Sequence, residues 1–122
     1  RQVIARGISI GETGVTGKAR VINNELDLSL ISLGEILIVN RNLLKSLPFS
    51  KHITGIITDE SQDECLKIFK KLKSNISTIC QLDLVDKNIK DGDLITLQLN
   101  EGVVYKGQIE GQDESSDKFK YV

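Results

Sequence analysis

ITGIITDESQDECLKIFKKL, residues 53–72, is the stretch that decides the fold. It opens with a short apolar run at 53–58 that is rich in β-branched residues, a composition typical of buried strands. Polar residues follow at 59–63, and apolar residues then recur at helical spacing. The apolar positions of this second half are Cys65, Ile68, Phe69 and Leu72. The stretch therefore predicts a strand that runs directly into an amphipathic helix.

The two ends of this helix carry their own markers. Ser61 followed three residues later by Glu64 has the pattern of a capping box. Lysines in the last turns complement the helix dipole, and Asn75 is the predicted left-handed stop. Because the strand leads straight into the capped helix, the connecting loop lies at the helix N-terminus. Many α/β proteins hold an anion or a reacting group at such a loop.

With its flanks, this stretch resembles the swivelling (mobile, phosphohistidine-type) domain of phosphoenolpyruvate-utilising enzymes. In that family a strand ending in Thr-Asp or Thr-Glu leads into a Gly-Gly-x-x-Ser-His loop. The histidine opens a helix that ends in Leu-Gly-Ile-Pro-Ala. In this chain Thr58 and Asp59 match, and Ser61 and Gln62 replace the two glycines. Residues 75–78, NIST, take the place of Gly-Ile-Pro-Ala.

The residues that carry the chemistry in the family are replaced. Cys65 stands for the serine and Leu66 for the histidine that takes the phosphoryl group. The loop that corresponds to the phosphohistidine site consists of Thr58, Asp59, Glu60, Ser61, Gln62, Asp63, Glu64, Cys65 and Leu66. Its carboxylates put negative charge at a helix end that would have to attract a phosphate. We therefore expect a degenerate loop with no catalytic, cofactor-binding or metal-binding residue, and no cofactor.

The rest of the chain fits the same scaffold. In the family the domain begins with a glycine-containing segment, and Gly7, Gly11 and Gly17 fit this segment. GEILIV at 34–39 matches the family's Gly-Asp-Ile-Leu-Val. A hairpin ending in Val-Tyr-x-Gly at 104–107 closes it. The resemblance covers residues 7–107 and implies an α/β fold, a compact swivelling β/β/α domain. The residues alone predict mixed α/β with about six short strands and two or three helices.

A glycine-rich segment, GETGVTGK at 11–18, has the composition of a nucleotide-binding loop but not its spacing. A phosphate loop needs glycine five positions before its Gly-Lys pair, and that position is Glu12. Lys18 is followed by Ala19 rather than by the Ser or Thr that binds magnesium. We therefore predict a glycine-permitted turn that feeds a strand at 19–22.

The remaining predicted elements are short. They are an edge segment within 3–10, a helix within 23–32 with Leu26, Leu30 and Ile31 on its inner face, a strand at 36–39 buried on both sides, a helical turn at 43–47, and strands at 77–80, 94–99 and 103–105.

The totals describe an ordinary globular chain of 122 residues, 39% hydrophobic and 27% charged. A net charge of -1 gives no electrostatic reason to expect nucleic acid or an acidic membrane as partner, and no apolar run approaches membrane-spanning length. The chain has no methionine, so we expect a segment of a longer polypeptide. We divide it into a mobile-like domain at 1–109 and a flexible polar tail at 110–122.

The chain has only two cysteines and one histidine as further candidates for a reactive side chain. Cys65 and Cys80 lack metal-ligand spacing and are interpreted as two buried, reduced thiols of an intracellular protein, in the cytoplasm or an organelle interior. A disulfide between them would have to bridge helix to strand. His52, the only histidine, precedes the strand whereas the reacting loop follows it, so we interpret it as an ordinary surface or half-buried residue.

Three functions remain open. The first is a non-catalytic domain of a larger enzyme, serving contact with other domains of the same polypeptide or with neighbouring subunits. The opening GISIGETGVTGKARV resembles the segment before the extra C-terminal domain of some pyruvate kinases, which makes a pyruvate kinase-like phosphotransferase the expected host. The second is a phosphotransfer domain of a dikinase, such as phosphoenolpyruvate synthase or pyruvate phosphate dikinase, with His52 or Cys65 as nucleophile. The third is a freestanding interaction domain.

Overall fold

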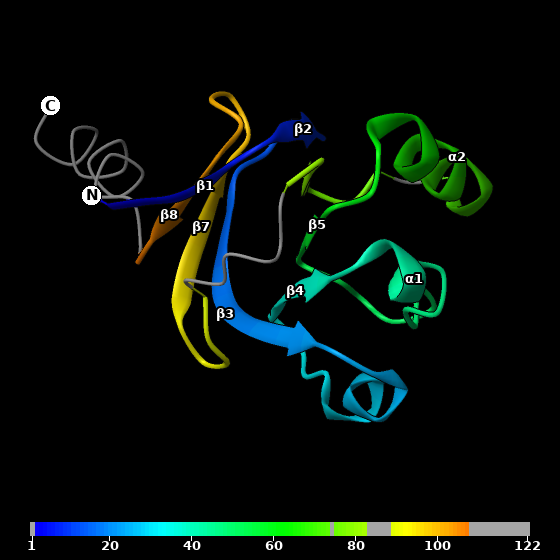
Figure 1. Cartoon of the computed structure of the whole chain (residues 1–122). Helices are drawn as coiled ribbons and strands as arrows, with labels where there is room; N and C mark the ends of the chain where they lie inside the picture. The colour runs from blue at the N-terminus through cyan, green and yellow to red at the C-terminus, as the bar shows by residue number, and fades with distance from the viewer. Residues whose placement is uncertain (1, 74, 83–88, 108–122) are drawn as a thin grey trace, which may run out of the picture.

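The computed structural model describes residues 2–73, 75–82 and 89–107 (Figure 1). Its elements, in chain order, are β1 (Gln2–Arg6), β2 (Ile8–Ile10), β3 (Val15–Ile22), the 3₁₀ helix η1 (Glu25–Leu30), β4 (Ile36–Val39), α1 (Arg41–Leu44), β5 (Gly55–Thr58), α2 (Gln62–Leu72), β6 (Thr78–Cys80), β7 (Leu94–Gln98) and β8 (Val103–Lys106).

The eight described strands form two sheets that share β3. Residues 15–18 of β3 pair antiparallel with β7, and residues 19–22 pair parallel with β4. The first sheet is therefore antiparallel, in the order β1-β8-β7-β3. The second sheet continues as β3-β4-β5-β6 with parallel pairing and ends in the antiparallel β2. The long bent course of β3 through both sheets is visible in Figure 1.

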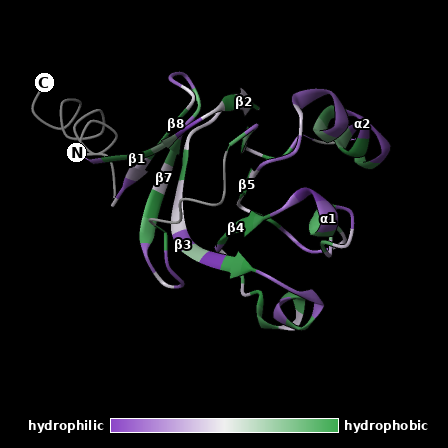
Figure 2. Ribbon diagram, in the orientation of Figure 1, coloured by the Kyte–Doolittle hydropathy of each residue, from purple (hydrophilic) through white to green (hydrophobic). Residues whose placement is uncertain are grey.

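The described residues pack as three layers with two main apolar cores, and a small third cluster contains Val103 and Tyr105. Along β4, Ile36 and Ile38 point toward the first sheet, whereas Leu37 and Val39 point toward the helices. This alternation is the two-residue period of a strand, and it makes all four residues buried. Hydrophobic colour runs along β4 and β7 in Figure 2. The predicted β/β/α architecture of the α/β class is confirmed.

The ends of the sheets meet at one residue. β1 lies at the outer end of the first sheet and β2 at the outer end of the second, and only Gly7 separates them in the chain. The Gly7 N–H donates to the Gly102 carbonyl oxygen at 2.8 Å. A Cβ atom placed on Gly7 would lie 2.4 Å from the Cys80 carbonyl oxygen. Only glycine lets the two sheets approach this closely.

Several sequence predictions about the strands need correction. The predicted edge segment within 3–10 is two strands that belong to different sheets. The strand predicted at 19–22 already begins at Val15, so part of the predicted turn at 11–18 is strand. The count of about six strands was too low for this reason. The strands predicted near 53–58, 77–80, 94–99 and 103–105 are present as β5, β6, β7 and β8.

The inner face predicted for residues 23–32 was partly wrong. Leu28 and Ile31 pack against the helix-side core, whereas Leu26 and Leu30 are exposed. The cause is the helix type, because η1 turns every three residues and brings positions three apart to the same side. The Asn24 side chain caps it by accepting from the Asp27 N–H at 3.2 Å.

The two α-helices differ from prediction mainly at their ends. α1 begins at Arg41, capped by the Asn40 side chain, rather than at residue 43. α2 has the predicted cap, Ser61, but its left-handed terminal residue is Lys73, at φ 58°, rather than Asn75. The described helices number three, which agrees with the prediction of two or three. The predicted tail at 110–122 lies outside the described residues.

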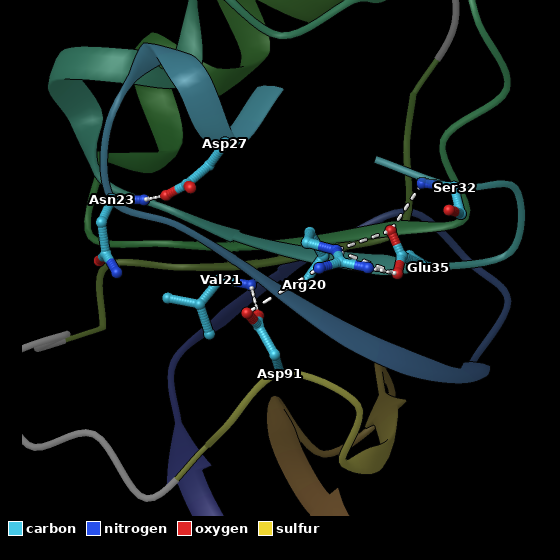
Figure 3. Close-up of polar contacts among 7 residues, drawn as sticks. All are labelled: Arg20, Val21, Asn23, Asp27, Ser32, Glu35 and Asp91. Atoms are coloured by element: carbon cyan, nitrogen blue, oxygen red, sulfur yellow. Dashed lines mark hydrogen bonds and ion pairs between the residues drawn. The ribbon is translucent and has the colours of Figure 1, made fainter. Parts of the chain in front are cut away.

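A polar cluster ties β3 to the segment between η1 and β4 (Figure 3). Arg20 donates to both carboxylate oxygens of Glu35, with Nη2–Oε2 at 2.8 Å. Glu35 Oε1 also accepts from the Ser32 N–H at 2.7 Å. Asp91 accepts from the Val21 N–H at 2.6 Å and lies 3.9 Å from the Arg20 guanidinium. These bonds hold the loop at 31–35 against the sheet.

Glu35 should contribute stability that is lost in acid. Its burial alone would raise its pKa, but hydrogen bonds from Arg20 and from the Ser32 N–H outweigh burial and lower the pKa below its usual value. A lowered folded-state pKa means that the stabilisation is present above the unfolded-state pKa, near 4.3, and is lost as pH falls through the folded-state value.

We expect Glu35→Gln to lower the free energy of unfolding at pH 7 by about 1–2 kcal/mol. The difference from the unmodified chain should shrink as pH falls through the acid range. Urea titrations between pH 7 and acid pH measure it, with Glu12→Gln, at an exposed carboxylate, as the control. A pH-independent difference between Glu35→Gln and the unmodified chain would contradict the assignment.

Candidate functional site

The loop between β5 and α2 lies at the carboxyl end of the parallel strands. Its first residue, Thr58, is completely buried at the end of β5, and its carbonyl oxygen accepts from the Leu82 N–H at 3.2 Å. The Thr58 hydroxyl accepts from the Glu60 N–H at 3.2 Å and so turns the chain out of the sheet. The loop is therefore anchored at both the strand and the segment after β6.

Side-chain oxygens of the chain itself accept from three amide groups at the start of α2, those of Ser61, Gln62 and Glu64. Ser61 Oγ accepts from the Glu64 N–H at 3.2 Å, and Glu60 Oε1 accepts from the Ser61 N–H at 2.8 Å. The Gln62 N–H donates to Gln81 Oε1 at 2.9 Å. These are the groups that an anion at a helix N-terminus would use. Half of the predicted capping box forms, because Glu60 rather than Glu64 reaches the Ser61 N–H.

Gln81 is a loop contact that the sequence prediction missed. Its backbone is in the left-handed region, at φ 59°, which is uncommon for a residue other than glycine. Its N–H donates to the Glu60 carbonyl oxygen at 2.9 Å while its side chain reaches the Gln62 N–H. The one marker in the sequence is a glutamine directly after the strand at 77–80. Its partners lie about twenty residues away, so local patterns could not reveal them.

The carboxylates of the loop are partly paired with basic residues. Glu64 lies 3.6 Å from Lys45 Nζ and 4.0 Å from Lys67 Nζ. Asp59 accepts from the Arg41 N–H at 2.8 Å, and its carboxylate lies 3.9 Å from Arg41 Nε. Asp59 and Glu64 therefore link the loop and α2 to α1. Asp63 is exposed to solvent. The contacts from α1 were not predicted.

Cys65 and Leu66, which the resemblance aligns with the reactive pair of the family, differ in burial. Cys65 is completely buried and hydrogen-bonds the equally buried Cys80, and both thiols are free. The bond to Cys80, burial, and the nearby Glu60 and Glu64 charges all raise the Cys65 pKa far above its ordinary value. A buried, protonated thiol is a poor nucleophile. Leu66, by contrast, is 39% exposed on the surface of α2.

His52 does not approach this loop. It is exposed and precedes β5, so that it lies at the opposite end of the strand from Asp59 and the start of α2. There it lines a hollow with Phe49, Leu72 and Ile76. The structure thus brings together the nine predicted loop residues but leaves the single histidine apart from them.

Two kinds of site are absent from the part of the chain that the structure describes. No group of three or more His, Cys, Asp or Glu side chains there is arranged to hold a metal ion. No helix among the same residues is long and apolar enough to cross a membrane.

Sequence comparisons connect the chain with two kinds of enzyme. No family model matches it. It is 26% identical over 113 residues to a probable phosphoenolpyruvate synthase of Archaeoglobus fulgidus, which covers 93% of this chain. It is 31% identical over 105 residues to a pyruvate kinase of Staphylococcus haemolyticus, covering 85%, and 31% identical over 109 residues to a phosphoenolpyruvate synthase of Synechocystis, covering 87%.

These matches are to segments of much longer proteins. The chain spans 15% of the Archaeoglobus protein, 18% of the Staphylococcus protein and 13% of the Synechocystis protein. One segment of about 105–113 residues is therefore similar to parts of both kinds of enzyme. The resemblance drawn from residues 7–107 is confirmed by this pairing and by the three-layer fold.

Proposed function

We propose that the chain is a non-catalytic, swivelling-type domain of a larger phosphoenolpyruvate-utilising enzyme, and that it serves contact between domains or subunits. A pyruvate kinase is the first candidate for the host, because the opening GISIGETGVTGKARV resembles the segment before the extra C-terminal domain of some pyruvate kinases, and two pyruvate kinases match 85–89% of the chain. The premise is the resemblance to the swivelling domain, whose framework this chain matches while Cys65 and Leu66 stand where the family has serine and histidine.

The occupied amide groups at the start of α2 are the observation that carries this proposal. Three amide groups, those of Ser61, Gln62 and Glu64, already donate to oxygens of this chain. A phosphate would have to displace those oxygens and approach Glu60 and Asp63 as well. At an effective dielectric constant near 20, a carboxylate about 4 Å from a phosphate opposes it by roughly 4 kcal/mol per unit charge. Salt bridges to Glu64 reduce this opposition without removing it.

The placement of the other candidate nucleophiles also supports a non-catalytic role. Cys65 is buried with a raised pKa, so a reactive thiolate would be scarce at neutral pH. His52 is exposed but separated from the loop by the length of β5. Neither side chain can meet a phosphate held at the start of α2.

A phosphotransfer domain of a dikinase is the second candidate. The matches to phosphoenolpyruvate synthases from Archaeoglobus fulgidus and Synechocystis favour it. It would need a nucleophile outside the loop, which makes His52 the residue to test.

We expect that Leu66→His alone does not create a phosphoryl carrier. Leu66 is partly exposed, so the variant should fold and present its imidazole to solvent. The donors of the helix end would still be occupied, and its charge would still oppose a phosphate. A second variant should be needed to accept the group. It combines Leu66→His with Glu60→Ala, Ser61→Gly, Gln62→Gly, Asp63→Asn, Glu64→Gln and Gln81→Gly, so that each described side-chain acceptor at the start of α2 is removed.

Transfer of labelled phosphate from phosphoenolpyruvate or ATP through a competent partner enzyme measures this difference. The unmodified chain and Leu66→His should stay unlabelled, and the combined variant should carry acid-labile label. Label on Leu66→His near the level of the combined variant would show that only the nucleophile was missing. Label on the unmodified chain that disappears in His52→Ala would establish the dikinase alternative instead.

A further inference from the structure

Residues 25–33, which we call the leucine ridge, carry exposed leucines and acidic residues on the helix side of the molecule. Its leucines, Leu26, Leu30 and Leu33, are 82%, 53% and 83% exposed. Glu25 and Asp27 lie among these leucines in the sequence, and Arg20, the cation next to them, is already paired with Glu35 and Asp91. Leu26 and Leu33 are the two most exposed large apolar side chains that the structure describes, and such exposure is a reason to look for a partner surface.

The ridge is held rigidly rather than left loose. The Arg20 guanidinium and the Ser32 N–H both bind Glu35, which fixes the loop that carries Leu33 (Figure 3). Asn24 caps η1, and the Asp27 carboxylate accepts from the Asn23 N–H at 2.8 Å. The leucines therefore face solvent because the local backbone presents them, and a partner would pay little to order them.

A groove of opposite charge lies between α2 and the segment after α1. Its volume is about 620 Å³, and its apolar wall is formed by Phe49, Ile68 and Leu72. Its rim carries four lysines and one acidic residue, Glu64, and the lysines are Lys45, Lys67, Lys70 and Lys71. This lysine-rimmed groove complements the leucine ridge in two ways. Its apolar wall can contact the leucines, and its positive charge is opposite to that of the acidic residues.

We propose that the leucine ridge of one copy docks into the lysine-rimmed groove of a second copy. This rests on the proposed contact role and names its partner. Opposite charges on the two surfaces favour their encounter, and a net charge of only -1 leaves little overall repulsion between copies. No other occupant is required, because the chain itself supplies both complementary surfaces.

The placement of the two surfaces fits a two-fold dimer. η1, α1 and α2 all pack against the same core on one side of the second sheet, and Figure 1 shows α1 between the other two. A two-fold axis near α1 would place each ridge over the groove of the other copy, so that the contact is made twice. Repetition matters, because a stable interface buries about 1,600 Å², more than one ridge of three leucines supplies.

Sedimentation of the 122-residue chain over a range of concentrations tests the proposal. We expect a monomer–dimer equilibrium that weakens with added salt. Leu33→Glu should raise the dissociation constant of the dimer about 100-fold, because the substitution enters both contacts. Leu94→Glu, at a leucine 44% exposed on the first sheet, is the matched control and should leave it unchanged.

A charge exchange distinguishes this specific contact from nonspecific hydrophobic association. Glu25→Lys and Lys71→Glu should each raise the dissociation constant several-fold, and the two together in one chain should restore it. A monomer at every concentration up to the millimolar range would overturn the proposal and point to another domain as occupant. Open-ended assemblies would overturn the two-fold arrangement. The sedimentation result and the phosphate-transfer result are independent of each other. Failure of the dimer proposal leaves the non-catalytic proposal standing, and transfer of labelled phosphate leaves the dimer proposal standing.

Discussion

Replacing Phe69 with alanine should lower the free energy of unfolding by about 4 kcal/mol. Phe69 is completely buried in the core between the second sheet and the helices, and its ring meets Phe49 edge to face at a centroid distance of 6.5 Å. Removing it leaves a cavity and also removes the favourable ring contact. For a chain of this size such a loss is a large part of the total stability.

Urea denaturation of the chain measures this effect, and Leu66→Ala is the matched control. Leu66 lies three residues earlier on the same helix and is 39% exposed, so its replacement should cost less than about 1 kcal/mol. If both variants lost the same free energy, α2 would not be docked on the second sheet through Phe69.

Gly7→Ala should destabilise the chain by about 3 kcal/mol through a steric clash. A Cβ at this position would lie 2.4 Å from the Cys80 carbonyl oxygen and 2.8 Å from Ile79 Cγ2. The backbone of β6 would have to move, and with it the pairing of β2 with β6. The effect arises from the folded packing and not from backbone conformation, because Gly7 is not in the left-handed region.

Gly34→Ala separates these two causes. Gly34 has φ 87° but no atom within 4 Å of an added Cβ, so it should lose only about 1 kcal/mol from backbone strain. Thermal or urea unfolding of both variants gives the comparison. Equal losses would mean that the close approach of the sheets at Gly7 is not as described.

The sequence predicted those parts of the fold that depend on residues adjacent to one another in the sequence. The apolar run at 36–39 predicted a strand buried on both faces, and Ser61 predicted the start of α2. The η1 segment was harder, because a 3₁₀ helix and an α-helix share the same composition but present different residues to the core. For that reason Leu28 packs inside, whereas Leu26 does not.

The arrangement of the loop depends on contacts that local patterns do not encode. Gln81 reaches the start of α2 because β6 runs beside β5 and ends next to it. Lys45 reaches Glu64 because α1 and α2 pack on the same core. The sequence identified which residues form the loop, but which groups occupy its donors followed only from the fold.

The junction at Gly7 has a consequence for how the chain folds. Gln2 pairs with Lys106 and Ile10 with Thr78, so the first ten residues find their partners only after most of the chain has been synthesised. Contacts this far apart in sequence are slow to form, because a long loop must close first. Until β8 is made, β1 lacks its partner on the growing polypeptide, so that among the described strands the last to be made pairs with the first.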